Sequence, residues 1–134
     1  MKVKDWALAL ALAVLAMILN VAMSFVWVFV YSQSEPGQTE AAYTAYAQEW
    51  APVSSVVFGA PIMFLAGWLA GRGRPVSEAA RIGLAVAAIY VAVDLAIILA
   101  VGAAGGVWMW AVLSWVTKLL FGWLGGRTGA AKAT

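Results

Sequence analysis

The stretch that decides the fold spans residues 79–124 and reads AARIGLAVAAIYVAVDLAIILAVGAAGGVWMWAVLSWVTKLLFGWL. It consists of two apolar runs, 79–101 and 107–124, joined by a short glycine-rich connection. Each run has about the 17 to 25 residues that a transmembrane helix needs. Because the connection is short, the sequence predicts two antiparallel helices that lie side by side.

Two further apolar runs precede this pair, at residues 6–31 and 53–70. The first carries no charged residue and is long enough to tilt in a bilayer. It is also much longer than the apolar part of a signal peptide, about 7 to 15 residues, so we interpret it as a retained helix. The sequence therefore predicts an all-α membrane protein, a single domain over residues 1–134 built as a four-transmembrane-helix antiparallel bundle.

The composition agrees with a membrane protein and argues against several kinds of site. Of the 134 residues, 65% are hydrophobic and only 10% are charged, whereas soluble proteins carry about 25% charged residues. The chain has no cysteine and no histidine, so we expect no disulfide framework, no metal site and no cofactor. No nucleophile–base pair or phosphate loop has a recognisable spacing, so we do not expect an enzyme.

Basic residues mark one side of the predicted membrane. They precede the first apolar run, lie between the second and third runs or at the start of the third, and follow the fourth; these residues are Lys2, Lys4, Arg72, Arg74, Arg81, Arg127 and Lys132. By the positive-inside rule, the sequence predicts cytoplasmic termini in a multi-pass protein of the cell inner (plasma) membrane. Because the basic residues form short clusters beside apolar runs, we do not expect nucleic acid as a partner.

Proline, glycine and hydroxyl residues suggest where the helices begin and end. Pro52 suits the first turn of the second helix, and Ser77 could cap the third. Glycines mark the expected ends of the second, third and fourth helices; they are Gly71, Gly73, Gly102, Gly105, Gly106, Gly125 and Gly126. Glycine is common at such positions because it adopts the backbone conformation that ends a helix.

The connection at residues 32–51 carries acidic and aromatic residues but no basic ones. Thr39 could cap a short helix in it, and three aromatic residues would share one face of that helix. These residues are Tyr43, Tyr46 and Trp50. We interpret the segment as a short interfacial helix that lies in the headgroup layer.

The same connection supports an alternative interpretation. It contains three glutamates, Glu35, Glu40 and Glu49. Without basic neighbours, these side chains could form a lip that attracts cations or binds a partner.

Two ionisable residues, Asp94 and Lys118, lie inside the predicted membrane. Counted along the helices from their outer ends, they lie about 12 Å and 17 Å deep, within side-chain reach of each other. A charged residue at the centre of a membrane helix costs about 2.5 to 3.5 kcal/mol on insertion scales. A direct ion pair would make the two residues a static clamp, whereas Lys118 alone could snorkel toward the interface. An unpaired Asp94 could instead take up and release protons.

The first and second helices bring polar or irregular residues to the same depth. Pro61 lacks the N–H group that would bond to the carbonyl of Val57. The predicted intramembrane polar cluster contains Asn20, Ser24, Pro61, Tyr90, Asp94, Ser114 and Lys118. The second helix also has a face for close packing, formed by Gly59, Met63, Gly67 and Gly71.

The sequence leaves two kinds of function open. One is a structural or accessory subunit that associates with itself or with a larger membrane complex through the polar layer. The other is a small proton- or cation-coupled transporter or channel component that uses Asp94. The chain is similar in size to the small multidrug-resistance transporters. Its first helix has no membrane-embedded glutamate, on which that resemblance depends, so their function does not carry over.

Overall fold

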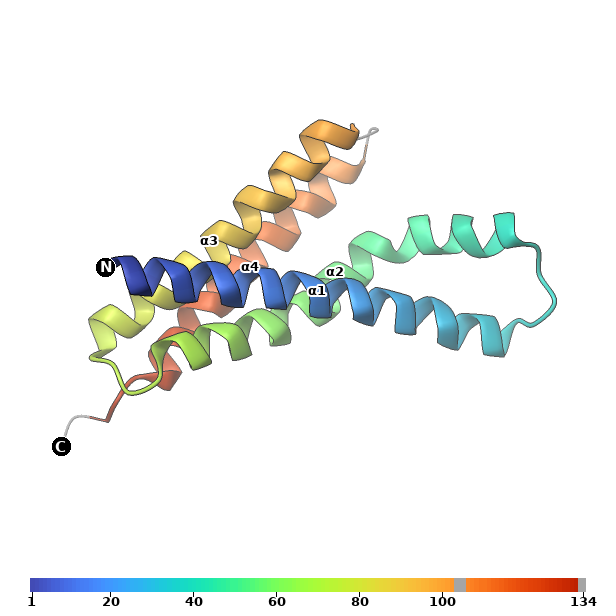
Figure 1. The fold of residues 1–134 in the computed structure, drawn as a ribbon. Coiled ribbons are helices and arrows are strands. Elements are labelled where there is room, and N and C mark those ends of the chain that lie inside the picture. Colours follow the sequence, from blue (N-terminus) through green and yellow to red (C-terminus); the bar gives the residue numbers. More distant parts are fainter. Residues whose placement is uncertain (103–105, 133–134) are drawn as a thin grey trace.

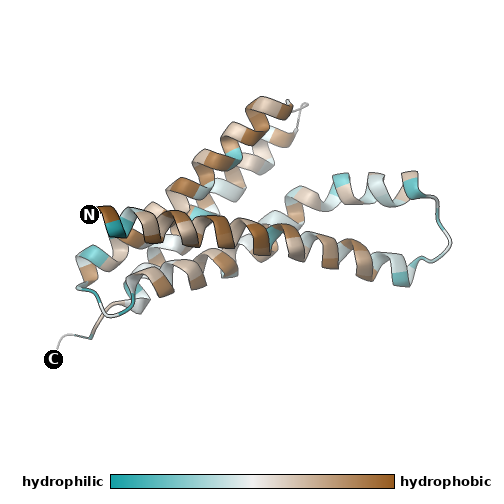
Figure 2. Cartoon of the chain, viewed as in Figure 1, coloured by the Kyte–Doolittle hydropathy of each residue, from teal (hydrophilic) through white to brown (hydrophobic). Residues whose placement is uncertain are grey.

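The chain forms four α-helices joined by short connections, in a computed structural model that describes residues 1–102 and 106–132 (Figure 1). The helices are α1 (Val3–Ser34), α2 (Glu40–Gly71), α3 (Val76–Val101) and α4 (Val107–Gly129). All four are long and apolar enough to cross a membrane, and apolar residues cover most of their length (Figure 2). The described residues contain no strand, so the all-α prediction is confirmed.

The helices pair into two antiparallel hairpins, α1–α2 and α3–α4, which cross each other (Figure 1). We call the end with residues 1–5, 72–78 and 127–132 the basic end. The end with residues 34–40 and the tips of α3 and α4 is the open end, because the hairpins diverge toward it (Figure 1). Within the described residues, α1 contacts α2 and α3 but not α4. The four helices therefore form the predicted bundle in the half of the molecule near the basic end, which we call the basic half. In the other half, the open half, the two hairpins separate.

Helix α4 fits tightly between α2 and α3 because glycines line the contact. A Cβ atom added at Gly67 of α2 would lie 2.3 Å from the carbonyl oxygen of Gly122 in α4. A Cβ atom added at Gly83 of α3 would lie 2.3 Å from the same oxygen. The three backbones thus meet with no side chain between them. In lipid, where the hydrophobic effect does not draw helices together, such close van der Waals packing is what holds them.

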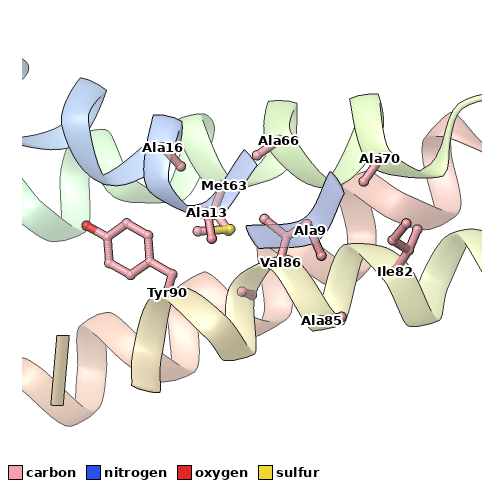
Figure 3. Close-up of a cluster of buried hydrophobic side chains, with 11 residues drawn as sticks. Ala9, Ala13, Ala16, Met63, Ala66, Ala70, Ile82, Ala85, Val86 and Tyr90 are labelled. Carbon is pink, nitrogen blue, oxygen red and sulfur yellow. The ribbon is translucent and has the colours of Figure 1, made fainter. Parts of the chain in front are cut away.

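Helix α1 joins this core through a stripe of alanines. Ala9, Ala13 and Ala16 are each at most 2% exposed and recur at helical spacing. Figure 3 shows them beside Met63 of α2 and Val86 of α3, in a cluster of buried side chains. The small alanine side chains let α1 approach both neighbours in the basic half.

An ion pair reinforces the basic end. Arg74 Nη1 lies 2.9 Å from Asp5 Oδ1, and the backbone N–H of Lys2 donates to Asp5 Oδ2 at 2.8 Å. Arg74 Nε also donates to the carbonyl oxygen of Ala70 at 3.0 Å. These contacts tie the start of α1 to the connection between α2 and α3.

The prediction of a separate interfacial helix in the 32–51 connection is wrong. Residues 40–51 are instead the first turns of α2, which continues through Pro52. Thr39 does cap this helix, since its hydroxyl oxygen accepts from the backbone N–H of Ala42 at 3.2 Å. Proline removes one backbone hydrogen bond without stopping the helix, and Figure 1 shows that α2 bends along its length. Packing against α1 compensates for the missing bond.

Aromatic side chains supply that packing near the open end. The ring of Tyr46 stacks on that of Tyr31 with 3.5 Å between centroids, and the ring of Trp50 stacks on that of Trp27 at 6.1 Å. Trp27 Nε1 also donates to the Tyr46 hydroxyl at 3.0 Å. The aromatic face predicted to lie among headgroups therefore joins α1 to α2.

Two other predicted helix boundaries are confirmed and two are wrong. Helix α2 ends at Gly71, and α3 ends before Gly102, whose φ of 87° suits glycine. Gly105 lies outside the described residues. Pro75, not Ser77, precedes the first turn of α3. Helix α4 continues past Gly125 and Gly126 to Gly129, because these glycines serve helix packing rather than termination.

Replacing a contact glycine should destabilise the fold. We predict that Gly67→Ala lowers the free energy of unfolding by about 1 to 3 kcal/mol, the usual cost of overpacking, because the new methyl group meets the backbone of α4. Unfolding in mixed micelles of increasing SDS content measures this change.

The matched control is Gly106→Ala. Gly106 has a helical φ of −67°, and a Cβ atom there meets nothing within 4 Å. Because Gly106 is the N-cap of α4, where alanine is less favourable than glycine, this variant should lose no more than about 1 kcal/mol. Equal stability of Gly67→Ala and Gly106→Ala would contradict the glycine-mediated packing.

Candidate functional site at the fork of the hairpins

Lys118 occupies the centre of a polar site where the two hairpins begin to diverge. Its side chain is only 1% exposed. The ammonium group donates to the hydroxyl of Ser114, one turn earlier in α4, and to the hydroxyl of Ser55 in α2 at 3.0 Å. It also lies 4.9 Å from the ring centroid of Tyr90 in α3, a distance suited to a cation–π interaction. These contacts satisfy a cation that would otherwise be costly to bury.

Gly59 makes room for this lysine. A Cβ atom added at Gly59 of α2 would lie 2.8 Å from Cε of Lys118 and 3.1 Å from Nζ. Ser55 lies one turn before Gly59, so a single face of α2 supplies both the space and a hydrogen-bond acceptor.

Asn20 brings α1 into the same network. Its Nδ2 donates to the Tyr90 hydroxyl at 2.7 Å and to the Ser55 hydroxyl at 3.3 Å. Ser24 donates to the backbone carbonyl of Asn20 at 3.2 Å, and its hydroxyl lies 3.1 Å from that of Ser54. All four helices are thus linked through buried polar groups near one depth. Since polar groups in hydrocarbon need partners, the network favours this one arrangement of the hairpins.

Asp94 does not form an ion pair with Lys118. Within the part of the chain that the structure describes, the salt bridge is that of Arg74 with Asp5. Asp94 Oδ2 instead accepts from Trp115 Nε1 at 2.6 Å. Lys118 does not snorkel either, because its ammonium is enclosed by Ser55, Ser114 and Tyr90.

Asp94 lines a pocket next to the network, between α2 and the α3–α4 hairpin. The pocket has a volume of about 230 Å³. The hydroxyl residues Ser55 and Ser114 line it together with Asp94 and Trp110. Its remaining walls are apolar or small residues, which are Ala51, Pro52, Ile98, Val107 and Ala111. The polar site therefore has a closed part around Lys118 and a hollow part at Asp94.

The structure gathers most of the predicted polar cluster. Asn20, Ser24, Tyr90, Ser114 and Lys118 lie in or beside the network, and Asp94 lies at the pocket. Pro61 does not belong to it, because Pro61 is exposed on the surface of α2.

The predicted cluster lacked three members of the site, which are Ser54, Ser55 and Trp115. The available signal was the spacing of Ser55 and Gly59, which places a hydroxyl and a gap on one helix face. The described residues hold no group of three or more acidic, histidine or cysteine side chains that could bind a metal ion. Comparisons with family models, curated proteins and solved structures find no match for this chain.

Double-mutant cycles should separate the two candidate pairings. We predict a coupling free energy of about 0.5 to 1.5 kcal/mol between Asn20→Ala and Tyr90→Phe, because their side chains share a hydrogen bond. The cycle of Asp94→Asn with Lys118→Met should give a smaller value, because these side chains form no ion pair and bond to separate partners. SDS unfolding of each single and double variant provides the values. A larger coupling for Asp94 with Lys118 than for Asn20 with Tyr90 would refute the described network.

Proposed function

We propose that this chain is a structural or accessory subunit of a membrane assembly, without enzymatic activity, that associates with copies of itself or with a larger complex. The observation that supports this proposal is the contrast between the two halves of the molecule. The basic half is closed by backbone contacts at Gly67, Gly83 and Gly122, while the open half leaves the hairpins apart (Figure 1). A fixed half that holds two apolar arms apart suits a scaffold for other membrane segments.

The surface for association is the region between the arms rather than the polar layer itself. The polar layer is enclosed within the chain, since Asn20, Ser114 and Lys118 are each at most 5% exposed. Between the arms, Ala51 borders the Asp94 pocket and a second pocket of about 300 Å³ between α1 and α2. A small residue between two hollows permits close approach of another helix.

Site-specific photocross-linking in native membranes tests this proposal. A photoreactive residue at Ala51, between the arms, should form adducts with a second copy or with another protein. The control position is Leu10, which is 51% exposed on α1 in the basic half and should label lipid. Only lipid adducts from Ala51, together with a monomer in mild detergent, would contradict the proposal.

We also propose that the basic end faces the cytoplasm and the open end faces outward. The basic end carries Lys2, Lys4, Arg72 and Arg74, whereas residues 5–71 contain no Lys or Arg. Such a bias agrees with the positive-inside rule for a plasma membrane protein.

Cysteine labelling of intact cells tests the orientation. The chain has no native cysteine, so Ser34→Cys and Ser77→Cys are matched single-cysteine variants at exposed sites near opposite ends. An impermeant thiol reagent should label Ser34→Cys in intact cells and Ser77→Cys only after permeabilisation. The reverse pattern would overturn the orientation.

A second candidate function is transport, and one observation favours it: the Asp94 carboxylate lines a pocket. Transport would require the site to open toward the basic end as well. Such opening would have to separate the glycine contacts between α2, α3 and α4, so we prefer the accessory function. Proton-dependent flux in reconstituted vesicles that disappears in Asp94→Asn would favour transport instead.

A further inference from the structure

Apart from Lys118 at the fork, the open half of the molecule carries only negative formal charge. The sequence has no Lys or Arg between Arg81 and Lys118 or between Lys4 and Arg72. The acidic residues of these two segments, Asp5 excepted, are Glu35, Glu40, Glu49 and Asp94. Their summed potential attracts cations toward the open end.

The Asp94 pocket has the chemistry that recognises an organic cation. Trp115 Nε1 donates to Oδ2 of Asp94, and no donor within the described residues bonds to Oδ1. The indole of Trp110 lines the same pocket, and an indole face attracts cations. A carboxylate attracts an ammonium ion by its charge, and an aromatic face attracts it by a cation–π interaction.

Lys118 does not occupy this pocket. Its ammonium lies behind the hydroxyls of Ser55 and Ser114, which accept its hydrogen bonds, and these two residues separate it from the hollow they line. The carboxylate of Asp94 is therefore the charged group that a ligand in the pocket would meet.

The pocket walls indicate which class of cation fits. A metal ion such as Ca²⁺ needs six to eight oxygen ligands and Mg²⁺ needs six, but the pocket offers one carboxylate and two hydroxyl groups. Pro52, Ile98 and Val107 give it apolar walls. Such walls suit a cation that carries its own apolar substituents.

We propose that the pocket at Asp94 binds a small monovalent organic ammonium ion that enters from the open end. The carboxylate of Asp94 pairs with the ammonium group. The indole face of Trp110 contacts the same group, and the apolar walls cover the alkyl groups of the ligand. Binding requires neither assembly with a partner nor movement of the glycine-packed half. It goes beyond the accessory function and supplies a ligand for the second candidate function.

Binding of choline to the purified chain tests this proposal. The chain is held in a maltoside detergent, which has no ammonium headgroup, and choline is titrated while tryptophan fluorescence is recorded. The matched control ligand is 3,3-dimethylbutan-1-ol, which has the shape of choline without its charge. We expect a saturable change with choline and none with the neutral compound. No saturable change with choline, or equal changes with both compounds, would overturn the proposal without the need for any variant.

Three variants locate the binding. Asp94→Asn should weaken choline binding by at least about tenfold, because it removes the negative charge that attracts the ammonium group. Trp110→Phe should weaken it by about two- to fivefold through the weaker cation–π interaction. Trp123→Phe, on the part of α4 near the basic end where Arg127 covers its ring, should leave affinity unchanged. Unchanged affinity in both pocket variants would overturn the assignment to Asp94.

These results are independent of the cross-linking test of assembly. If the chain does not bind choline but forms protein adducts at Ala51, only the proposal of a cation site is overturned. If the chain binds choline but forms only lipid adducts at Ala51, only the proposal of an accessory function is overturned.

Discussion

The close contact of three helix backbones is the constraint on which the rest of this structure depends. Gly122 of α4 faces Gly67 of α2 and Gly83 of α3 with no room for a methyl group. Because lipid offers no hydrophobic driving force for helix association, the helices are held by this shape complementarity. The contact is confined to the basic half, so it also sets where the hairpins separate (Figure 1).

The polar site lies where the glycine contacts give way to the diverging arms. Gly59 makes a last gap on α2, and the side chain of Lys118 fills it. Once buried there, the lysine requires acceptors, and Ser55 and Ser114 provide them. The network through Asn20 and Tyr90 then fixes α1 and α3 as well. Packing and polar contacts thus favour the same arrangement, and Asp94 is left beside the pocket.

Much of this fold could be predicted from the sequence, because apolar runs are a strong signal in membrane proteins. The partners of Asp94 and Lys118 could not, because depth alone does not fix which way a side chain points. Two helix boundaries were predicted wrongly, each for a physical reason. Pro52 resembles a helix start but lies within α2, where stacking on α1 offsets the lost hydrogen bond. Gly125 and Gly126 resemble a helix end, yet α4 continues through them because neighbouring backbones occupy the space.

The central claim is that the basic half is fixed while the arms stay apart, and pulsed electron paramagnetic resonance in lipid nanodiscs tests it most directly. Spin labels at Val3 and Val76, which are exposed at the starts of α1 and α3, should report a short and narrow distance distribution. Labels at Phe29 and Leu99, which are exposed on the arms, should report a clearly longer distance. A short, narrow distance between Phe29 and Leu99, equal to that at the basic end, would contradict the account.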